Sequence, residues 1–193
     1  STPHLGVDAL YIASQIVVAV QGLVTRRTSP TEPVIIGIGK LNAGTTYNAV
    51  AAFAEMEGTT RTISQESRDR VRAQVSETAQ SIAALYGGTA EIEWTDFAAA
   101  LVNDPQVCRE AAEVVDELLG EGHVVTDREL SLSGDNFAEF ELYKPGAYAY
   151  LGTGNPDLPH TMITNHNGGF DVDENALVTG AGLYVGYTVA RLG

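Results

Sequence analysis

Residues 34–61 read VIIGIGKLNAGTTYNAVAAFAEMEGTTR, and this stretch decides the fold of the first half of the chain. Val34 to Lys40 is rich in β-branched residues, and Asn42-Ala43-Gly44 has the composition of a turn. Tyr47 to Arg61 is long and contains few residues that break a strand. We therefore expect two neighbouring antiparallel strands.

Helical patterns lie on both sides of this hairpin. On its N-terminal side, Asp8 is placed to cap a helix whose apolar residues recur at helical spacing and which ends before Pro30. On its C-terminal side, Ser64 caps an amphipathic helix that ends at Gly87-Gly88. Residues 90–95 then alternate between apolar and polar side chains, which predicts a half-buried strand.

The resulting order, α-β-β-α-β, is that of the split β-α-β motif without its first strand. We therefore expect residues 1–98 to form an α+β, ferredoxin-like domain whose first strand would lie before Ser1.

Near residue 100 the succession of helix and strand signals gives way to one helix followed by long loops, which predicts a domain boundary there. Asn103-Asp104-Pro105 has the cap and the proline of a helix start, and Gly120 ends that helix. Loops follow as far as Asp173, which we expect to cap a closing helix. Residues 99–193 are thus predicted to form a second region.

Composition excludes several classes of protein. The chain has 25 acidic and 11 basic residues, a formal net charge of −14, which repels nucleic acids and anionic membranes. The single cysteine, Cys108, cannot form an intramolecular disulfide, so we expect a reducing, cytoplasmic location. We find no secretory signal and expect no stretch that crosses a membrane.

Two sets of residues have the chemistry of a functional site. Between His160 and Glu174, two histidines lie near carboxylates, a donor set that suits zinc, manganese or cobalt. On spacing alone, loop polar groups and helix caps explain them at least as well. Asn48 and Arg61 could converge on a substrate carboxylate, or could be a turn amide and a solvated strand-end arginine.

Short motifs in a particular order carry a resemblance to a known enzyme family. They are Pro3-His4-Leu5-Gly6-Val7-Asp8-Ala9, Gly44-Thr45-Thr46-Tyr47-Asn48-Ala49-Val50, Gly58-Thr59-Thr60-Arg61-Thr62, Asn103-Asp104, Asp135-Asn136-Phe137 and His166 through Leu177. In this order they resemble the C-terminal half of the metal-dependent amidohydrolases related to hippurate hydrolase, aminoacylase and auxin-conjugate hydrolase.

The resemblance implies a fold and an assembly. Members of this family have an α/β, zinc-peptidase-like catalytic domain that holds two divalent metal ions (zinc, manganese or cobalt). An inserted lid domain interrupts it and forms the dimer interface. Residues 1–98 would be most of the lid, residues 99–193 the C-terminal part of the catalytic domain, and the protein a homodimer.

The resemblance also implies roles for individual residues. His166 stands at the start of an HxxxFDxDE pattern and resembles the last metal ligand, while Asn48 and Arg61 correspond to lid residues that engage the substrate. His4 matches a lid histidine of less certain role, and Asp135-Asn136 departs from the family's Glu-Asp pair.

The implied reaction is hydrolysis of the amide bond of N-acyl amino acids or related conjugates. The family's other metal ligands and its catalytic glutamate would lie before Ser1, so the 193 residues alone are expected to be inactive. The alternative is a non-catalytic dimerisation or binding module of the same fold.

Overall fold

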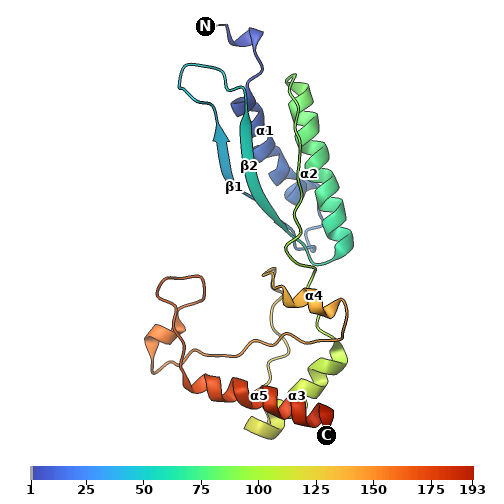
Figure 1. Cartoon of the computed structure of the whole chain (residues 1–193), viewed down its shortest axis with the longest axis vertical. Coiled ribbons are helices and arrows are strands. Elements are labelled where there is room, and N and C mark those ends of the chain that lie inside the picture. Colours follow the sequence, from blue (N-terminus) through green and yellow to red (C-terminus); the bar gives the residue numbers. More distant parts are fainter. Residues whose placement is uncertain (1) are drawn as a thin grey trace. The chain divides into compact units, whose positions relative to one another are not determined.

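An antiparallel hairpin is at the centre of the first half of the chain (Figure 1). Its strands are β1 (Ile35–Ala43) and β2 (Ala54–Arg61), and the register runs from Ile35↔Arg61 to Ala43↔Ala54. The predicted pair of antiparallel strands is confirmed, but β2 begins at Ala54 and not at Tyr47. Because the ladder closes at Ala43↔Ala54, residues 44–53 form the connecting loop.

Gly58 of β2 lies opposite Ile38 of β1, beside an irregularity in the register. A Cβ atom at Gly58 would lie 2.5 Å from the carbonyl oxygen of Gly37 and 2.8 Å from Cδ1 of Ile38. Since the first of these atoms is backbone, the strands would have to separate. We expect Gly58→Ala to lower the free energy of unfolding by about 1–3 kcal/mol in urea titrations.

Gly39→Ala is the matched control for this strand prediction. A Cβ atom at Gly39 would meet nothing within 4 Å, so we expect a change of at most about 0.5 kcal/mol. Equal losses of stability in the two variants would contradict the assignment of a steric role to Gly58.

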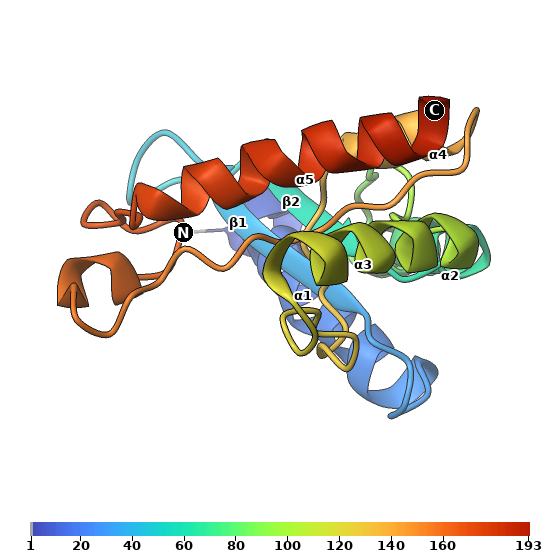
Figure 2. The same cartoon turned by 90° about the horizontal axis from the view of Figure 1, so that it is seen from below.

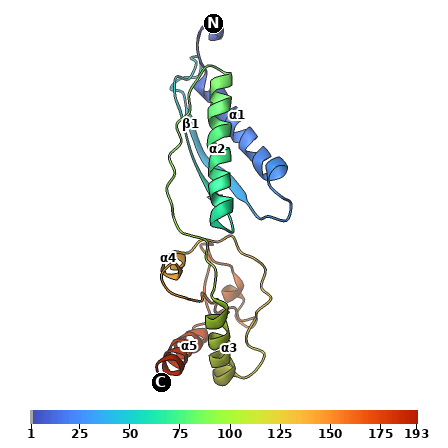
Figure 3. The ribbon, with the colours of Figure 1, turned by 90° about the vertical axis from the view of Figure 1, so that its right-hand side faces the viewer.

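Two helices cover the hairpin. α1 (Ala9–Gly22) begins at Asp8, whose Oδ1 accepts the backbone N–H groups of Leu10 at 3.1 Å and Tyr11 at 3.3 Å, and it continues into a π-helical turn, η2 (Leu23–Arg27). A short 3-10 turn, η1 (Pro3–Leu5), precedes it. Figure 3 shows α1 and α2 side by side.

α2 (Gln65–Leu85) has the start and the end that the sequence predicts. The hydroxyl of Ser64 accepts the N–H of Ser67 at 3.1 Å. At the other end Gly87 has a φ of 78°, and the N–H of Gly88 donates to the carbonyl of Ala83 at 2.8 Å. This is the left-handed C-terminal cap that glycine favours.

The core of this unit lies between the helices and the hairpin. Its buried side chains come from α1, η2, β1, the residue before β1, and α2: Ile12, Ile16, Val20, Leu23, Val34, Ile36, Val71, Ala79 and Ala83. By length and composition alone, Ala9–Arg27 could cross a membrane, which the sequence analysis did not expect. The same stretch supplies four of these core residues, and 28% of its apolar window is buried in the structure.

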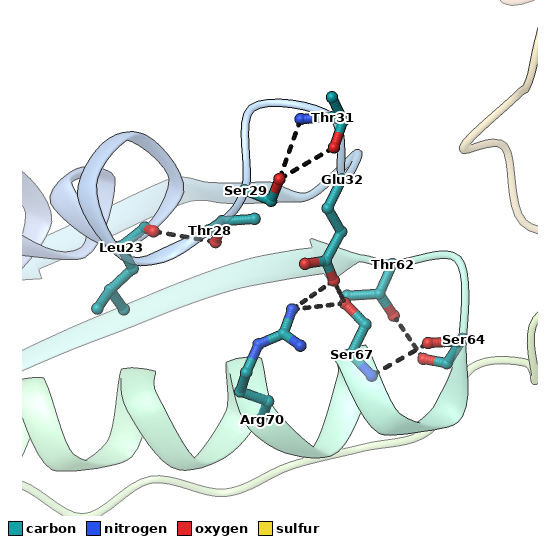
Figure 4. Close-up of polar contacts among 9 residues, drawn as sticks. All are labelled: Leu23, Thr28, Ser29, Thr31, Glu32, Thr62, Ser64, Ser67 and Arg70. Atoms are coloured by element: carbon teal, nitrogen blue, oxygen red, sulfur yellow. Dashed lines mark hydrogen bonds and ion pairs between the residues drawn. The ribbon is translucent and has the colours of Figure 1, made fainter.

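A polar cluster joins the loop before β1 to the start of α2 (Figure 4). The hydroxyl of Ser67, which is buried, donates to Oε1 of Glu32 at 2.5 Å, and the Arg70 guanidinium pairs with the same oxygen. These contacts, the Ser67 hydrogen bond first, hold the pKa of Glu32 below its usual value. The carboxylate is therefore charged at neutral pH and fixes the loop to the helix.

The strand predicted over residues 90–95 does not form. Within residues 2–193 the sheet contains only β1 and β2, and residues 89–100 carry no ladder. The alternation is nevertheless real: Ala90 and Ile92 pack against the core, while Glu91 and Glu93 are exposed. The pattern reports burial on one face, but a strand also needs a hydrogen-bonding neighbour, and the described residues supply none.

Side chains hold this extended segment against α2. The indole N–H of Trp94 donates to Oγ of Ser76 at 3.1 Å, and the guanidinium of Arg72 lies 5.3 Å from the centre of the Trp94 ring. Arg68 and Arg72 both pair with Asp96.

The structure describes residues 2–193, which form two compact units. The first runs to Ala100 and includes Ser131–Asn136, and the second comprises Leu101–Leu130 and Phe137–Gly193. The sequence analysis placed the boundary between residues 98 and 99 and assigned all residues after it to the second region.

The second unit is built from helices and long loops. Its helices are α3 (Pro105–Leu119), α4 (Phe137–Glu141), the 3-10 turn η3 (Pro159–Met162) and α5 (Asn175–Leu192). Oδ1 of Asp104 accepts the N–H groups of Gln106 at 2.8 Å and Val107 at 3.0 Å, which confirms the predicted start of α3.

α3 and α5 pack side by side (Figure 2). A Cβ atom at Gly186 of α5 would lie 2.7 Å from Cγ1 of Val114 in α3. Glycine at this position therefore permits the two helices to approach each other closely. At one end, Glu110 accepts hydrogen bonds from Arg191 at 2.9 and 3.0 Å and from the Tyr187 hydroxyl at 3.1 Å.

Candidate functional site

His166 lies in the loop between η3 and α5, and its side chain is exposed. Its φ angle is 61°, the left-handed region, and among the described residues no other residue except glycine has a positive φ. This conformation costs an L-residue about 1–2 kcal/mol. Such strain persists only where the surrounding structure imposes it, and it is concentrated at functional sites.

A local turn follows His166. Oδ1 of Asn167 accepts the N–H of Gly169 at 2.9 Å, and the N–H of Phe170 donates to the carbonyl of Asn167 at 3.0 Å. The residues directly after His166 are therefore held in a turn.

The two flanks of this loop meet at Asn155. Its backbone N–H donates to Oγ1 of Thr161 at 2.9 Å, and its side-chain Nδ2 donates to Oδ2 of Asp173 at 2.7 Å. Thr161 is buried, whereas Asn155 and Asp173 are half-buried. The sequence analysis did not single out Asn155, although the Gly154-Asn155-Pro156 turn was a visible signal.

Asp173 does not cap α5 in the expected way, because the helix begins at Asn175 with Glu174 as its cap residue. Oδ1 of Asp173 instead accepts the N–H of Asn175 at 3.0 Å and its Nδ2 at 2.9 Å, and the backbone N–H of Asp173 donates to the carbonyl of Thr153 at 2.9 Å. The Asn155 hydrogen bond is the main reason that the pKa of Asp173 lies below its usual value.

The donors predicted between His160 and Glu174 gather only in part. Nε2 of His160 lies 3.8 Å from Oδ2 of Asp171, and both side chains are exposed. Across residues 2–193, no three or more histidine, cysteine or acidic side chains come together as a metal centre would require. His166 is therefore not part of a cluster of three or more such donors among the described residues.

Arg61 and Asn48 lie at opposite ends of the hairpin. Arg61 pairs with Ile35 at one end of the ladder, and Asn48 lies in the loop that joins the strands at the other. The structure therefore does not bring the two side chains together within one copy.

Both side chains nevertheless keep hydrogen-bonding capacity. The Arg61 guanidinium donates to Oγ1 of Thr59 at 2.6 Å and to the carbonyl of Thr60 at 3.3 Å, and within residues 2–193 no carboxylate forms an ion pair with it. Oδ1 of Asn48 accepts the hydroxyl of Thr46 at 3.0 Å.

The remaining candidates have local settings. His4 lies in η1 and is exposed, and Asp135-Asn136 directly precedes α4. Cys108 is half-buried in α3.

Comparison with known proteins gives a consistent result. Residues 1–87 match the family described as the peptidase dimerisation domain. The chain is 32% identical over 182 residues to thermostable carboxypeptidase 1 of Saccharolobus solfataricus, covering 94% of this chain and 45% of the relative. It is 31% identical over 175 residues to the N-acetylcysteine deacetylase of Bacillus subtilis, covering 91% and 44%.

A solved structure shares the fold. A dinuclear metal-binding peptidase of the M20 family from Bacillus subtilis superposes with a TM-score of 0.76 at 28% identity, covering 96% of this chain and 46% of the other. The chain thus spans a little under half the length of the relatives that it matches.

Proposed function

We propose that this chain is part of an M20-family enzyme, and that it supplies the lid and the closing part of the catalytic domain of a metal-dependent amidohydrolase. Its substrates would be N-acyl amino acids or related conjugates. His166 would supply one ligand to the two divalent ions of such an enzyme, and the bound ions would provide Lewis acidity toward the scissile carbonyl and lower the pKa of the attacking water.

The observation that carries the proposal is the placement of His166. An exposed imidazole on a strained backbone, held by a hydrogen-bonded loop, is suited to bind a metal ion. The solved relative is described as dinuclear, while the described residues of this chain gather no complete set of ligands. We infer that the other ligands and the general base come from polypeptide outside these 193 residues.

The chemistry of Arg61 supports a substrate that carries a carboxylate. Arg68, Arg70, Arg72 and Arg191 all pair with acidic side chains. Arg61 has no such partner among the described residues, as is also true of Arg26, Arg27, Arg109 and Arg128, so its guanidinium is available to bind a substrate carboxylate. The net charge of −14 repels an anionic substrate, and an available cation at the binding site offsets that repulsion locally.

A homodimer would place Asn48 and Arg61 in the same region. If two copies of the hairpin pair antiparallel about a twofold axis, the loop end of one lies beside the strand end of the other. The Asn48 amide of one copy could then reach a substrate held by Arg61 of its partner.

We also propose that a strand from before Ser1 supplies the neighbour that residues 90–95 lack, completing the split β-α-β arrangement.

The proposal is tested by assaying the complete protein on N-acyl amino acids after removal of metal with a chelator and after its return. We expect activity to disappear and to recover with zinc, manganese or cobalt, and the isolated 193 residues to show no turnover. A complete protein that dimerises but neither binds metal nor hydrolyses such amides would establish the non-catalytic dimerisation module instead.

A further inference from the structure

The loop that carries His166 is closed at its base by side chains whose role the proposed function does not explain. The closing group, here called the Asn155 clamp, consists of Asn155, Thr161, Asp173 and Asn175. It joins the segment before η3 to the segment before α5, and the His166 loop lies between them.

Asn155 is the centre of this clamp. Its Nδ2 donates to Asp173, its Oδ1 accepts the N–H of Asp157 at 3.0 Å, and its backbone N–H donates to Thr161. The hydroxyl of Thr161 in turn donates to the carbonyl of Leu158, 2.8 Å away. Asn155 thus contacts both flanks, one through its backbone and the other through its side chain.

Asp173 is the acceptor on the other flank, and both of its carboxylate oxygens are used. Oδ2 accepts from Asn155, while Oδ1 accepts from the backbone and the side chain of Asn175. An aspartate that served only to cap α5 would need the Asn175 contact but not the one to Asn155. The hydrogen bond across the base of the loop therefore has a separate consequence, which is to join the two ends of the segment that contains His166, whose φ is 61°.

We propose that Asn155 and Asp173 are positioning residues whose side-chain hydrogen bond holds the His166 loop in the conformation that binds metal. This inference rests on the proposed function, because it takes His166 to be a metal ligand. Removing a group that orients a metal ligand typically weakens metal binding 10–100-fold.

The test exchanges the donor and the acceptor in the complete protein. Asp173→Asn leaves one acceptor oxygen where the carboxylate used two, so it cannot accept from both Asn155 and Asn175, and Asn155→Asp places two carboxylates together; each single variant therefore loses a hydrogen bond of the clamp. The double variant restores it with the direction reversed and the net charge unchanged. Asp157→Asn, an exposed acid beside the clamp whose side chain takes no part in it, is the matched control for charge.

The readout is the zinc dissociation constant, measured by competition with a chromophoric chelator, together with the melting temperature. We expect each single variant to bind zinc about 10–100-fold more weakly, and the double variant and Asp157→Asn to lie within about twofold of the unmodified protein. If a single variant does not fold, the double variant and the other single variant still give the comparison.

Two results would overturn the clamp. Single variants that melt at lower temperature but bind zinc normally would show a purely structural role, and a double variant as weak as the singles would show that the hydrogen bond is not the cause. His166→Ala separates this from the larger proposal: if it binds zinc normally, the assignment of His166 fails and the clamp fails with it.

Discussion

Replacing His166 with alanine in the complete protein is expected to lower zinc affinity and amide hydrolysis together, each by at least about 100-fold. The physical reason is that a catalytic metal keeps only a few protein ligands, so the loss of one imidazole removes a direct bond. Removing a group that only hydrogen-bonds to a metal ligand already lowers metal affinity or activity up to about 100-fold. Metal content by elemental analysis and turnover of an N-acyl amino acid are the measurements.

His160→Ala is the matched control for this prediction. His160 belongs to the same unit and is exposed, but it lies beside Asp171 without a third donor. We expect its removal to leave metal content and turnover unchanged. A loss of metal in His160→Ala, with retention in His166→Ala, would mean that the wrong histidine was assigned.

Arg61→Ala is expected to lower kcat/KM for a substrate with a free carboxylate about 10- to 150-fold. This range corresponds to the roughly 1.5–3 kcal/mol of a hydrogen bond to a charged group. For the same substrate with its carboxylate converted to an amide, Arg61→Ala should lower kcat/KM only slightly, because the neutral group does not form the charge-assisted hydrogen bond. Steady-state kinetics on the two substrates provide the measurement.

Arg26→Ala controls for the loss of a surface charge. Arg26 is an exposed arginine of the same unit at the end of η2, outside the hairpin that carries Arg61. We expect it to leave both kinetic constants unchanged. Equal losses on the charged and neutral substrates in Arg61→Ala would contradict carboxylate recognition and point to a role in the fold.

Local signals predicted the helices well. Asp8, Ser64 and Asp104 cap helices as their positions in the sequence indicate, and Gly87 ends α2. These motifs act through hydrogen bonds within a few residues, so no tertiary information is needed to find them.

Features that depend on distant partners were predicted less well. The alternation over residues 90–95 reports burial correctly, but whether a ladder forms depends on a neighbouring strand that the described residues lack. The start of β2 moved from Tyr47 to Ala54 because the register, and not propensity, decides where pairing ends.

The candidate site shows the same division. The family pattern around His166 was visible in the sequence, but the strain at its backbone and the contact between Asn155 and Asp173 were not. That contact joins residues that are distant in the sequence, and only the path of the loop brings them together. Likewise, residue types suggested that Asn48 and Arg61 could act on one carboxylate, but the hairpin register separates them within one copy.

The most direct test of the central claim is anomalous diffraction at the zinc absorption edge from crystals of the complete protein. We predict an anomalous peak about 2.0–2.1 Å from a ring nitrogen of His166, with its remaining ligands from polypeptide outside these 193 residues. A zinc centre that excludes His166 altogether would contradict the account.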